Sequence, residues 1–166
     1  MNAMQLSPQG IEWLKTIECL ACTPYDDQTG QPVSCWVPGA TIGYGHLIAG
    51  SEWPRYSEGI DQAGAEALLC SDLAPFVATV NASIGVPLRQ NRFDALVILA
   101  YNIGRDAFAR SSVVKLVNDP AAHTAYPDLE QAWKAWNKSQ GRVMQGLVNR
   151  RNAEWTMYST GRYEYW

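Results

Sequence analysis

The chain has 166 residues, of which 47% are apolar and 17% are charged, and its net charge at neutral pH is −3. This length predicts one domain with a buried core, so stability requires neither a metal nor a disulfide, and the composition excludes intrinsic disorder. The acidic balance excludes an electrostatic nucleic-acid-binding surface. No apolar run approaches the roughly 20 residues of a membrane span, and residues 1–10 lack signal-peptide features.

Four cysteines leave two interpretations open. Cys19 and Cys22 form a CxxC pair, but the second pair that a structural zinc site needs is absent, so we expect no metal and no other cofactor. A disulfide between Cys35 and either Cys19 or Cys22 would fit an oxidising compartment. Free, partly buried thiols, including Cys70, are the other interpretation, and we favour it.

The first elements are a helix and a small sheet. A helix is predicted from Ser7-Pro8 to Glu18, because serine caps free amides, proline suits the first helical position, and apolar residues recur at helical spacing. Glu18 ends this helix, where the helix dipole disfavours an ionised carboxylate. Between residues 23 and 50, glycines and prolines break helices while β-branched and aromatic residues favour strands, which predicts an irregular antiparallel sheet.

The rest of the chain is predicted to be mostly helical. After a loop at 51–59, Asp61 is a helix N-cap, and Pro75 is expected to kink or end that helix near Ala74. Residues 90–103 are apolar on nearly all sides, which is typical of a central buried helix, and Gly104 is its expected C-cap. Shorter helices are expected at Ser112–Asn118, Asp128–Trp136 and Leu147–Tyr158.

The predicted fold class is therefore α+β within a single domain. A β-rich lobe would cover about 20–60, and a helical lobe would cover about 1–19 and 61–166. A cleft between two such lobes is a natural place for a polymeric substrate.

The candidate catalytic residues lie between Glu18 and His46. Eight residues separate Glu18 from Asp27, and the run ATIGYGH then supplies Thr41 and His46. Two carboxylates with a polar third partner are the minimum equipment for hydrolysis of a glycosidic bond.

This arrangement resembles the phage-type lysozymes of glycoside hydrolase family 24. The matching motifs, in order from Ile11 to about Tyr158, are the glutamate and YDD, with eight residues between Glu18 and the final Asp27, then TIGYGH, SDL, QNRFDALVILAYNIG and AWNKSQGRVMQGLVNRRNAE. The resemblance implies a lysozyme-like fold. It also implies hydrolysis, with inversion, of the β-1,4 bond between N-acetylmuramic acid and N-acetylglucosamine in peptidoglycan.

The resemblance also implies residue roles. Glu18 would be the general acid, Asp27 the second carboxylate that stays ionised, and Thr41 the residue that holds the attacking water. His46 could act in catalysis, because an imidazole titrates near neutrality. We instead expect it to pair with Asp72 as a structural contact.

Positions that line the family's cleft supply the expected substrate-binding residues, which are Tyr44, Asn102, Trp136, Gln140 and Arg151. Asn102 would contact either sugar or Trp136, or else satisfy a helix end. One arginine of the pair Arg150-Arg151 is expected near Glu18, and the sequence leaves open which one.

One segment departs from the family pattern. Thirteen residues separate Asp27 from Thr41, so Gln31–Pro38 is an expected insertion relative to shorter phage enzymes. It either packs as a longer turn through Trp36 or adds a rim that contacts substrate. The longer hairpin resembles lysozyme domains of bacterial toxins and secreted effectors, which would imply an immunity protein as a partner.

Two other functions remain open. A lytic transglycosylase would act on the same bond with one acid and no positioned water. A catalytically inactive peptidoglycan-binding module would result if Asp27 and Thr41 did not face Glu18. In each case we expect a monomer that meets peptidoglycan in the periplasm. A holin, a secretion system or a larger protein would deliver it.

Overall fold

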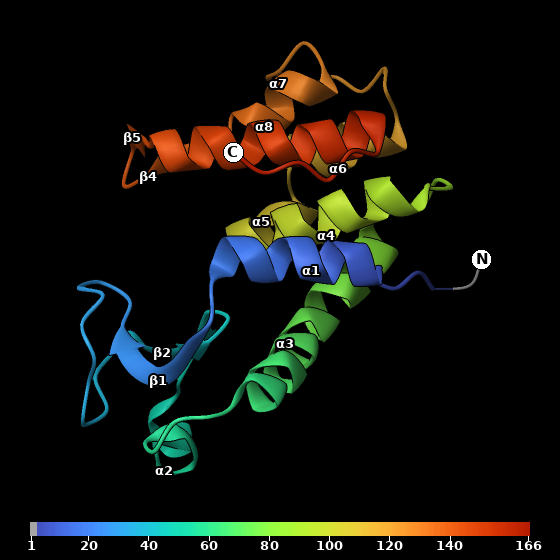
Figure 1. The fold of residues 1–166 in the computed structure, drawn as a ribbon. Coiled ribbons are helices and arrows are strands. Elements are labelled where there is room, and N and C mark those ends of the chain that lie inside the picture. The colour runs from blue at the N-terminus through green and yellow to red at the C-terminus, as the bar shows by residue number, and fades with distance from the viewer. Residues whose placement is uncertain (1–2) are drawn as a thin grey trace. The chain divides into compact units, whose positions relative to one another are not determined.

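The computed structural model describes residues 3–166 and divides into two compact units. The β unit comprises Glu12–Ala74, and the helical unit comprises Pro75–Trp166 together with the N-terminal residues up to Ile11. The two unit boundaries fall inside α1 and α3 (Figure 1). In chain order the elements are α1 (Pro8–Glu18), β1 (Ala21–Asp26), β2 (Ala40–Gly43), β3 (His46–Leu47), the 3-10 helix η1 (Gly50–Glu52), α2 (Trp53–Tyr56), α3 (Gln62–Ser83), α4 (Gln90–Ile103), α5 (Arg105–Ala109), α6 (Ser112–Asn118), α7 (Leu129–Lys134), β4 (Lys138–Ser139), β5 (Arg142–Val143) and α8 (Gln145–Thr160).

The β unit contains the predicted antiparallel sheet. Its three strands lie in the order β1-β2-β3, and Tyr25 of β1 pairs with Thr41 of β2, which in turn pairs with Leu47 of β3. The β1–β2 register is irregular between Ala21 and Tyr25. The sheet prediction is therefore confirmed, including its irregularity.

The segment Gln31–Pro38 packs on the β unit as a longer turn. Val33 and Val37 pack against a buried cluster that contains Ile42, Ile48 and Tyr56. Trp36 donates a hydrogen bond from Nε1 to the carbonyl of Ile48 at 2.9 Å. The apolar residues of this segment therefore contribute to the core of the unit, although Trp36 itself stays 43% exposed.

Helix α3 begins as predicted but does not end at Pro75. Asp61 Oδ1 accepts a hydrogen bond from Gly64 N at 2.7 Å, which confirms the N-cap. The helix then continues through Pro75 to Ser83, so the predicted end near Ala74 is wrong, while the alternative, a kink at Pro75, stays a prediction. Proline costs about 3 kcal/mol inside a helix, and burial of Leu73 before it and of Val77 and Val80 after it offsets that cost.

By length and mean hydropathy, α3 could also cross a membrane, contrary to the expectation that no segment would qualify. Its two acidic residues form ion pairs inside the β unit. Glu66 pairs with Lys15 at 2.7 Å, and Asp72 pairs with His46 at 2.9 Å. Acidic side chains that are paired in this way indicate a helix that packs within a folded unit.

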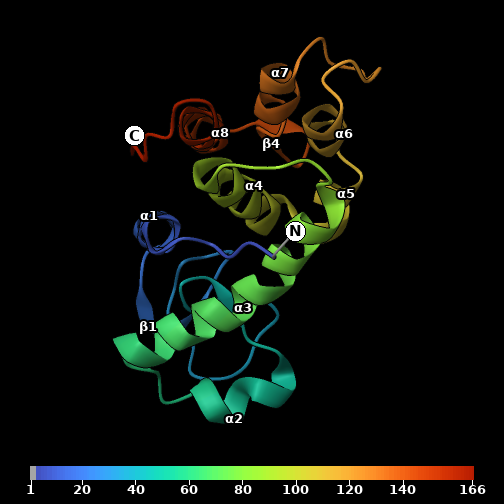
Figure 2. The same ribbon diagram turned by 90° about the vertical axis from the view of Figure 1, so that its right-hand side faces the viewer.

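The helical unit is built around α4, which has the predicted bounds. Every residue from Phe93 to Ala100 is buried. Helix α8 lies beside it, and α5, α6 and α7 complete the unit (Figures 1 and 2). Gly104 caps α4 at a φ of 93°, and its amide donates to the carbonyl of Ala100 at 2.9 Å. The prediction of a central buried helix is confirmed.

A buried carboxylate holds the N-terminal turn and the C-terminal tail to α4. Asp94 is fully buried and accepts hydrogen bonds from Ser7 N at 3.0 Å, Gln90 Nε2 at 2.8 Å and the phenol of Tyr163 at 2.6 Å. The hydroxyl of Ser7 donates to the same carboxylate. Ser7 also accepts a hydrogen bond from Gly10 N at 3.0 Å, so it is the predicted N-cap of α1.

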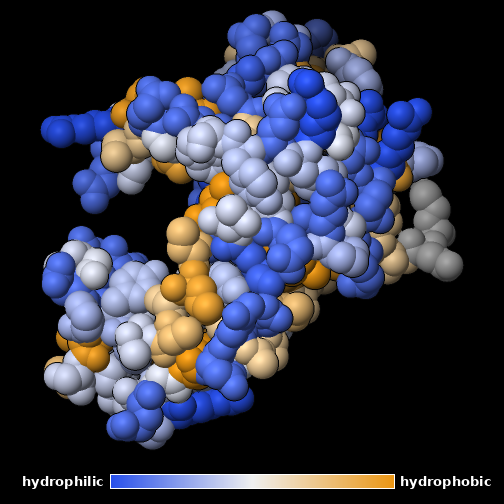
Figure 3. All heavy atoms as spheres, viewed as in Figure 1, coloured by the Kyte–Doolittle hydropathy of each residue, from blue (hydrophilic) through white to orange (hydrophobic). Residues whose placement is uncertain are grey.

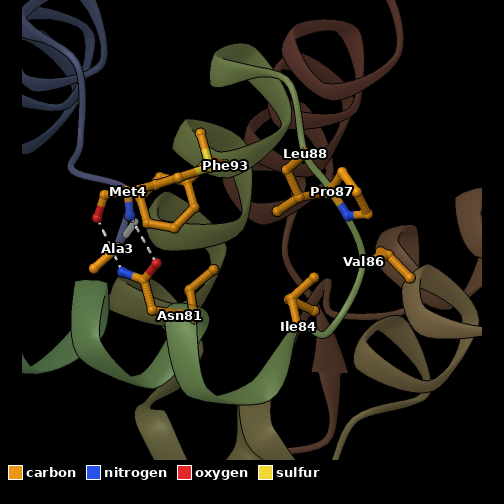
Figure 4. Close-up of a pocket in the computed structure, with 9 residues that line it drawn as sticks. Ala3, Met4, Asn81, Ile84, Val86, Pro87, Leu88 and Phe93 are labelled. Carbon is orange, nitrogen blue, oxygen red and sulfur yellow. Dashed lines mark hydrogen bonds between the residues drawn. The ribbon is translucent and has the colours of Figure 1, made fainter. Parts of the chain in front are cut away.

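The N-terminal segment is held to the end of α3 by Asn81 (Figure 4). Met4 N donates to Asn81 Oδ1, and Asn81 Nδ2 donates to Met4 O, each at 2.9 Å. An apolar cavity of about 240 Å³ lies beside this contact, lined in part by Ile84, Leu88 and Phe93. These contacts fix the segment that precedes α1.

Some elements and side chains differ from the predictions. Helices η1, α2 and α5 and the hairpin of β4 and β5 were not predicted, because each is only two to five residues long.

All four cysteines are free and exposed, so the expectation of partial burial is wrong. Figure 3 shows hydrophobic residues at the surface in patches among hydrophilic ones.

Candidate active site

The three candidate catalytic residues all belong to the β unit. Glu18 is the last residue of α1, Asp27 follows β1 directly, and Thr41 lies in β2. Asp27 is exposed, Glu18 is half-buried, and Thr41 is 4% exposed. The turn from α1 into β1 and the pairing of β1 with β2 therefore bring them into one small region.

A single backbone carbonyl connects Asp27 to Thr41. The carbonyl of Gly39 accepts a hydrogen bond from Asp27 N at 3.0 Å and another from Thr41 Oγ1 at 2.9 Å. Gly39 has a φ of +98°, and a Cβ there would lie 2.5 Å from Asp27 Oδ1. Only glycine fits this position, because it allows both the left-handed backbone and the close carboxylate.

Tyr25 lies on β1, opposite Thr41. It pairs with Thr41 across the sheet, so the two side chains share one face. Burial raises the pKa of the Tyr25 phenol, and the negative charges of Asp27 and then Glu18 raise it further. The pKa of this phenol therefore depends on the charges of both candidate carboxylates.

Glu18 is placed by two backbone features. A Cβ on Gly45 would lie 3.7 Å from Glu18 Oε2, so the carboxylate lies against a backbone that lacks a side chain. Directly after Glu18, Cys19 has a φ of 58°. A left-handed residue here ends α1, reverses the chain toward β1 and costs about 1–2 kcal/mol for a residue other than glycine.

His46 lies between two carboxylates. Its Nδ1 is 3.0 and 2.9 Å from the two oxygens of Asp72, and its Nε2 is 3.4 Å from Glu52 Oε2. The pKa of Glu52 is lowered, first by the hydrogen bond that Ala49 N donates to it. The pair of His46 and Asp72 joins β3 to α3, and its structural role remains a prediction.

Tyr44 lies near a charged group that joins α1 to α3. Lys15 Nζ is 2.9 Å from Glu12 and 2.7 Å from Glu66, and it is 5.9 Å from the centroid of the Tyr44 ring. The hydrogen bonds to Glu66 and then Glu12 raise the pKa of Lys15 above its usual range. Tyr44 is 6% exposed.

Two of the predicted substrate-binding residues contact each other in the helical unit. Arg151 Nη2 donates to Asn102 Oδ1 at 2.6 Å and to Glu154 Oε1 at 2.9 Å. Glu154 also accepts from Arg150 Nε at 3.1 Å and from Trp133 Nε1 at 3.0 Å. Burial lowers the pKa of Arg151, whereas the charge of Glu154 raises it.

The other two lie between α7 and α8. Trp136 is half-buried in the turn after α7. Gln140 is exposed in the β4–β5 hairpin, at a φ of 48°. Neither Trp136 nor Gln140 forms a hydrogen bond with Asn102 or with Arg151, which bonds to Asn102 and Glu154.

Comparison with known proteins places the chain in a family. The profile of the phage lysozyme family, described as "Phage lysozyme", matches residues 15–154. The chain belongs to the phage lysozyme family. This match includes every predicted site residue, from Glu18 to Arg151.

Relatives of this phage lysozyme family member include viral and bacterial proteins. The endolysin of Bacillus phage PZA is 38% identical over 95% of this chain, which spans 56% of that relative's length. A solved endolysin from Escherichia coli O157:H7 phage FAHEc1 has a TM-score of 0.76 at 32% identity, covering 98% of each chain. The muramidase domain of SpmX from Asticaccaulis excentricus has a TM-score of 0.73 at 32% identity, covering 94% of this chain and 98% of that one. The predicted α+β lysozyme-like fold is therefore confirmed.

Sequence reasoning missed several residues that lie beside the candidate site residues. Gly39, Tyr25 and Glu52 were not singled out, although each contacts or lies beside a predicted residue. The glycine that precedes ATIGYGH was a usable signal, since a glycine next to paired strands often marks a close approach. Glu154 was also missed, and its spacing of three and four residues from Arg151 and Arg150 places all three on one helix face.

Proposed function

We propose that this protein is a peptidoglycan hydrolase, an N-acetylmuramidase that cleaves the β-1,4 bond between N-acetylmuramic acid and N-acetylglucosamine. The observation that carries the proposal is the carbonyl of Gly39, which binds both Asp27 N and Thr41 Oγ1. Tyr25 beside them responds to the charges of both Asp27 and Glu18. Two carboxylates and a hydroxyl on one lobe are the groups that glycosidic hydrolysis requires.

Each of the three residues has a distinct role in the proposed reaction. Glu18 donates its proton to the glycosidic oxygen as the sugar C1–O bond breaks, which leaves positive charge on the ring. Asp27 is ionised when the bond breaks and stabilises that charge. Asp27 and Thr41 together orient a water molecule that attacks C1 from the opposite face. The proton that this water loses passes to Asp27 and from there to solvent, and solvent returns a proton to Glu18. Inversion requires room for this water, and hence carboxyl groups roughly 6.5–9.5 Å apart.

Family membership supports peptidoglycan as the partner of the site. The matched domain of SpmX is described as a muramidase, and the phage relatives are described as endolysins. A lytic transglycosylase is the alternative on the same bond. It needs only one acidic residue, so the fixed pair of Asp27 and Thr41 favours hydrolysis over that reaction.

The phage relatives also favour a role in cell lysis over a toxin role. In this proposal the protein acts on the wall as an endolysin, and a holin or secretion system delivers it. A role as a secreted effector with an immunity protein is the competing assignment. Only coexpression with a candidate inhibitor, followed by a lysis assay, would support it.

Digestion of purified sacculi tests the proposed reaction. Wild-type protein should release reducing ends, and mass spectrometry should find hydrated muramic-acid ends. Glu18→Gln should lower the rate by about 10²–10⁴-fold, because it removes a general acid. Glu12→Gln, six residues earlier on the same helix and paired with Lys15, is the matched control and should retain the wild-type rate.

Three results would contradict the proposal. Anhydro-muramic ends would identify a lytic transglycosylase. Equal rates for wild type and Glu18→Gln would remove Glu18 from the chemistry. Retention of the protein on sacculi without any product would identify a binding module.

A further inference from the structure

The segment between β1 and β2 holds an exposed tryptophan that the proposed reaction does not use. β1 ends at Asp26 and β2 begins at Ala40, so this segment is the long connection between two strands of the β unit (Figure 1). Within it, Val33 and Val37 pack against the buried cluster of the unit, whereas Trp36 between them is 43% exposed. Packing of the two valines therefore holds the segment in place and leaves the indole at the surface.

The ring of Trp36 has a fixed position. Its Nε1 donates a hydrogen bond to the carbonyl of Ile48 at 2.9 Å. A Cβ on Gly50 would lie 3.6, 3.7 and 3.8 Å from Cε2, Cδ2 and Cζ2 of the indole. Because these three distances are nearly equal, Gly50 lies over a face of the indole and not at its edge. The hydrogen bond and Gly50 together hold one face of the ring against the β unit.

The opposite face of the indole is available to a ligand. Across residues 3–166, the structure records neither an aromatic ring nor a cation against Trp36. Since Gly50 covers one face, the exposed area of the side chain comes mainly from the other face and the outer edge. A ring that is already immobile loses little conformational entropy when it binds a ligand.

The chemistry around the ring favours an uncharged partner. Residues 28–45 contain no charged side chain, and the single donor of the indole is already used within the unit. The open face therefore offers a flat apolar surface. An aromatic face carries negative electrostatic potential, so it attracts C–H groups, whose hydrogens are slightly positive. One face of a hexose ring consists largely of such C–H groups.

Hydrogen bonds connect the surroundings of this ring to the candidate catalytic residue Asp27. Ile48 N donates to Ala40 O at 2.7 Å, and Asp27 N donates to Gly39 O at 3.0 Å. Trp36 is three residues from Gly39, so at most about 11 Å of extended chain separates the two. A polymeric substrate extends over several sugar rings on either side of the bond that reacts. A sugar ring close to that bond can therefore reach the indole.

We propose that Trp36 is a substrate-binding residue, and that the open face of its indole packs against the C–H face of one N-acetylhexosamine ring of the glycan strand. The connection between β1 and β2 thus has two functions, because its valines stabilise the β unit and its tryptophan extends the surface that binds the polymer. This inference rests on the proposed function, since it takes the substrate of that reaction as its ligand. It assigns Trp36 no part in breaking the bond.

Binding of peptide-free glycan strands tests the proposal without turnover. The strands are prepared from sacculi with an amidase, and the protein carries Glu18→Gln so that they stay intact. In ¹⁵N NMR titrations, the strands should shift the indole resonance of Trp36, which is assigned by its loss in Trp36→Phe. The indole resonance of Trp133, which is fully buried, is the reference and should shift less.

Two apolar replacements separate ring stacking from general hydrophobic contact. Trp36→Phe and Trp36→Leu both remove the hydrogen bond to Ile48, but only phenylalanine keeps a flat ring. Trp36→Leu should raise the dissociation constant of the strands about three- to tenfold, the size expected for one aromatic contact, and Trp36→Phe should raise it about twofold or less. With Glu18 intact, Trp36→Leu should raise KM by the same factor and leave kcat unchanged, because it removes binding and no chemical group.

Trp53→Phe is the matched control. Trp53 is half-buried in the same unit and packs against the same buried cluster. Its replacement should lower the free energy of unfolding, measured with denaturant, and leave the dissociation constant of the strands unchanged. If Trp36 were merely structural, strand binding would follow the free energy of unfolding across all three variants.

Other results would overturn the inference. An unmoved Trp36 resonance, equal weakening by Trp36→Leu and Trp36→Phe, or equal weakening by Trp53→Phe would each do so. Binding to phosphatidylglycerol vesicles that depends on Trp36, with unchanged strand binding, would assign the ring to a membrane surface. Failure of sacculus digestion would remove the muramidase activity alone, since the titrations involve no cleavage. Sacculus digestion combined with strand binding that does not depend on Trp36 would remove only this inference.

Discussion

The two units hold their polar groups in opposite ways. In the β unit, Asp27 is exposed, and its geometry is set by the backbone of a glycine turn. In the helical unit, Glu154 is fully buried and accepts hydrogen bonds from two arginines and a tryptophan. The exposed carboxylate remains available for reactants, whereas the buried one is occupied by hydrogen bonds from its neighbours. We infer that the first cluster serves chemistry and the second serves stability.

The largest expected effect sharpens this contrast in the helical unit. Glu154→Gln leaves the buried guanidinium of Arg151 without its carboxylate, and breaking a buried ion pair in this way costs about 3–5 kcal/mol. Denaturant unfolding should show that loss. Glu130→Gln is the control, because the exposed pair of Glu130 and Lys134 should contribute about 0–1 kcal/mol. Similar losses for both variants would contradict the contrast.

The next largest expected effect, in the β unit, separates the displacement of Asp27 from backbone strain at a glycine. Gly39→Ala would place a Cβ 2.5 Å from Asp27 Oδ1, whereas Gly30, at a φ of +69°, has no atom within 4 Å of such a Cβ. Both variants should lose about 1–2 kcal/mol through left-handed strain. Only Gly39→Ala should also lose turnover, by about 10²-fold, because small displacements of reacting groups have effects of that size. Equal turnover in the two variants, measured on sacculi, would contradict the role of Gly39.

A smaller effect concerns the tie between the C-terminal tail and α4. Tyr163→Phe removes the hydroxyl that donates to buried Asp94, so the free energy of unfolding at pH 7 should fall by about 1–3 kcal/mol. Thermal unfolding at a series of pH values would measure this loss.

The same variant has an expected pH signature. Burial and then the hydrogen bond with Asp94 raise the pKa of Tyr163 above its usual range. A raised pKa means that this stabilisation is complete below the unfolded value of about 10 and is lost as the pH rises above it. The difference between wild type and Tyr163→Phe should therefore shrink above pH 10. A difference that grows there would contradict the assignment.

The smallest effect concerns the turn after Glu18. Cys19 has a φ of 58°, which favours glycine. Cys19→Gly should stabilise the protein by up to about 1 kcal/mol or leave it unchanged, as measured by denaturant unfolding, since glycine suits the residue that ends a helix. Cys22→Gly is the control and should destabilise, because Cys22 lies in β1.

The sequence predicts those features that depend on local pattern. The all-round apolar character of 90–103 predicts α4 with its observed bounds, and the Ser7-Pro8 start predicts α1. Asp27 and Thr41 were singled out because motifs flank them, and their catalytic roles stay predictions. These signals arise within a few residues, so no tertiary information is needed to read them.

Other features depend on contacts between distant segments. The continuation of α3 through Pro75 depends on apolar residues buried on both sides of it. The shared carbonyl of Gly39 depends on the strand register, which a sequence pattern does not specify. The partners of Glu154 come from α7 as well as α8, so its burial has no local signature.

One paired measurement tests the central contrast most directly: turnover on sacculi and the free energy of unfolding, both for Asp27→Asn and for Glu154→Gln. We predict that Asp27→Asn loses most turnover while its unfolding free energy stays within about 0.5 kcal/mol of wild type. Glu154→Gln should lose about 3–5 kcal/mol while its folded fraction still turns over substrate. The account would be contradicted if Asp27→Asn unfolded as readily as Glu154→Gln and its folded fraction kept wild-type turnover.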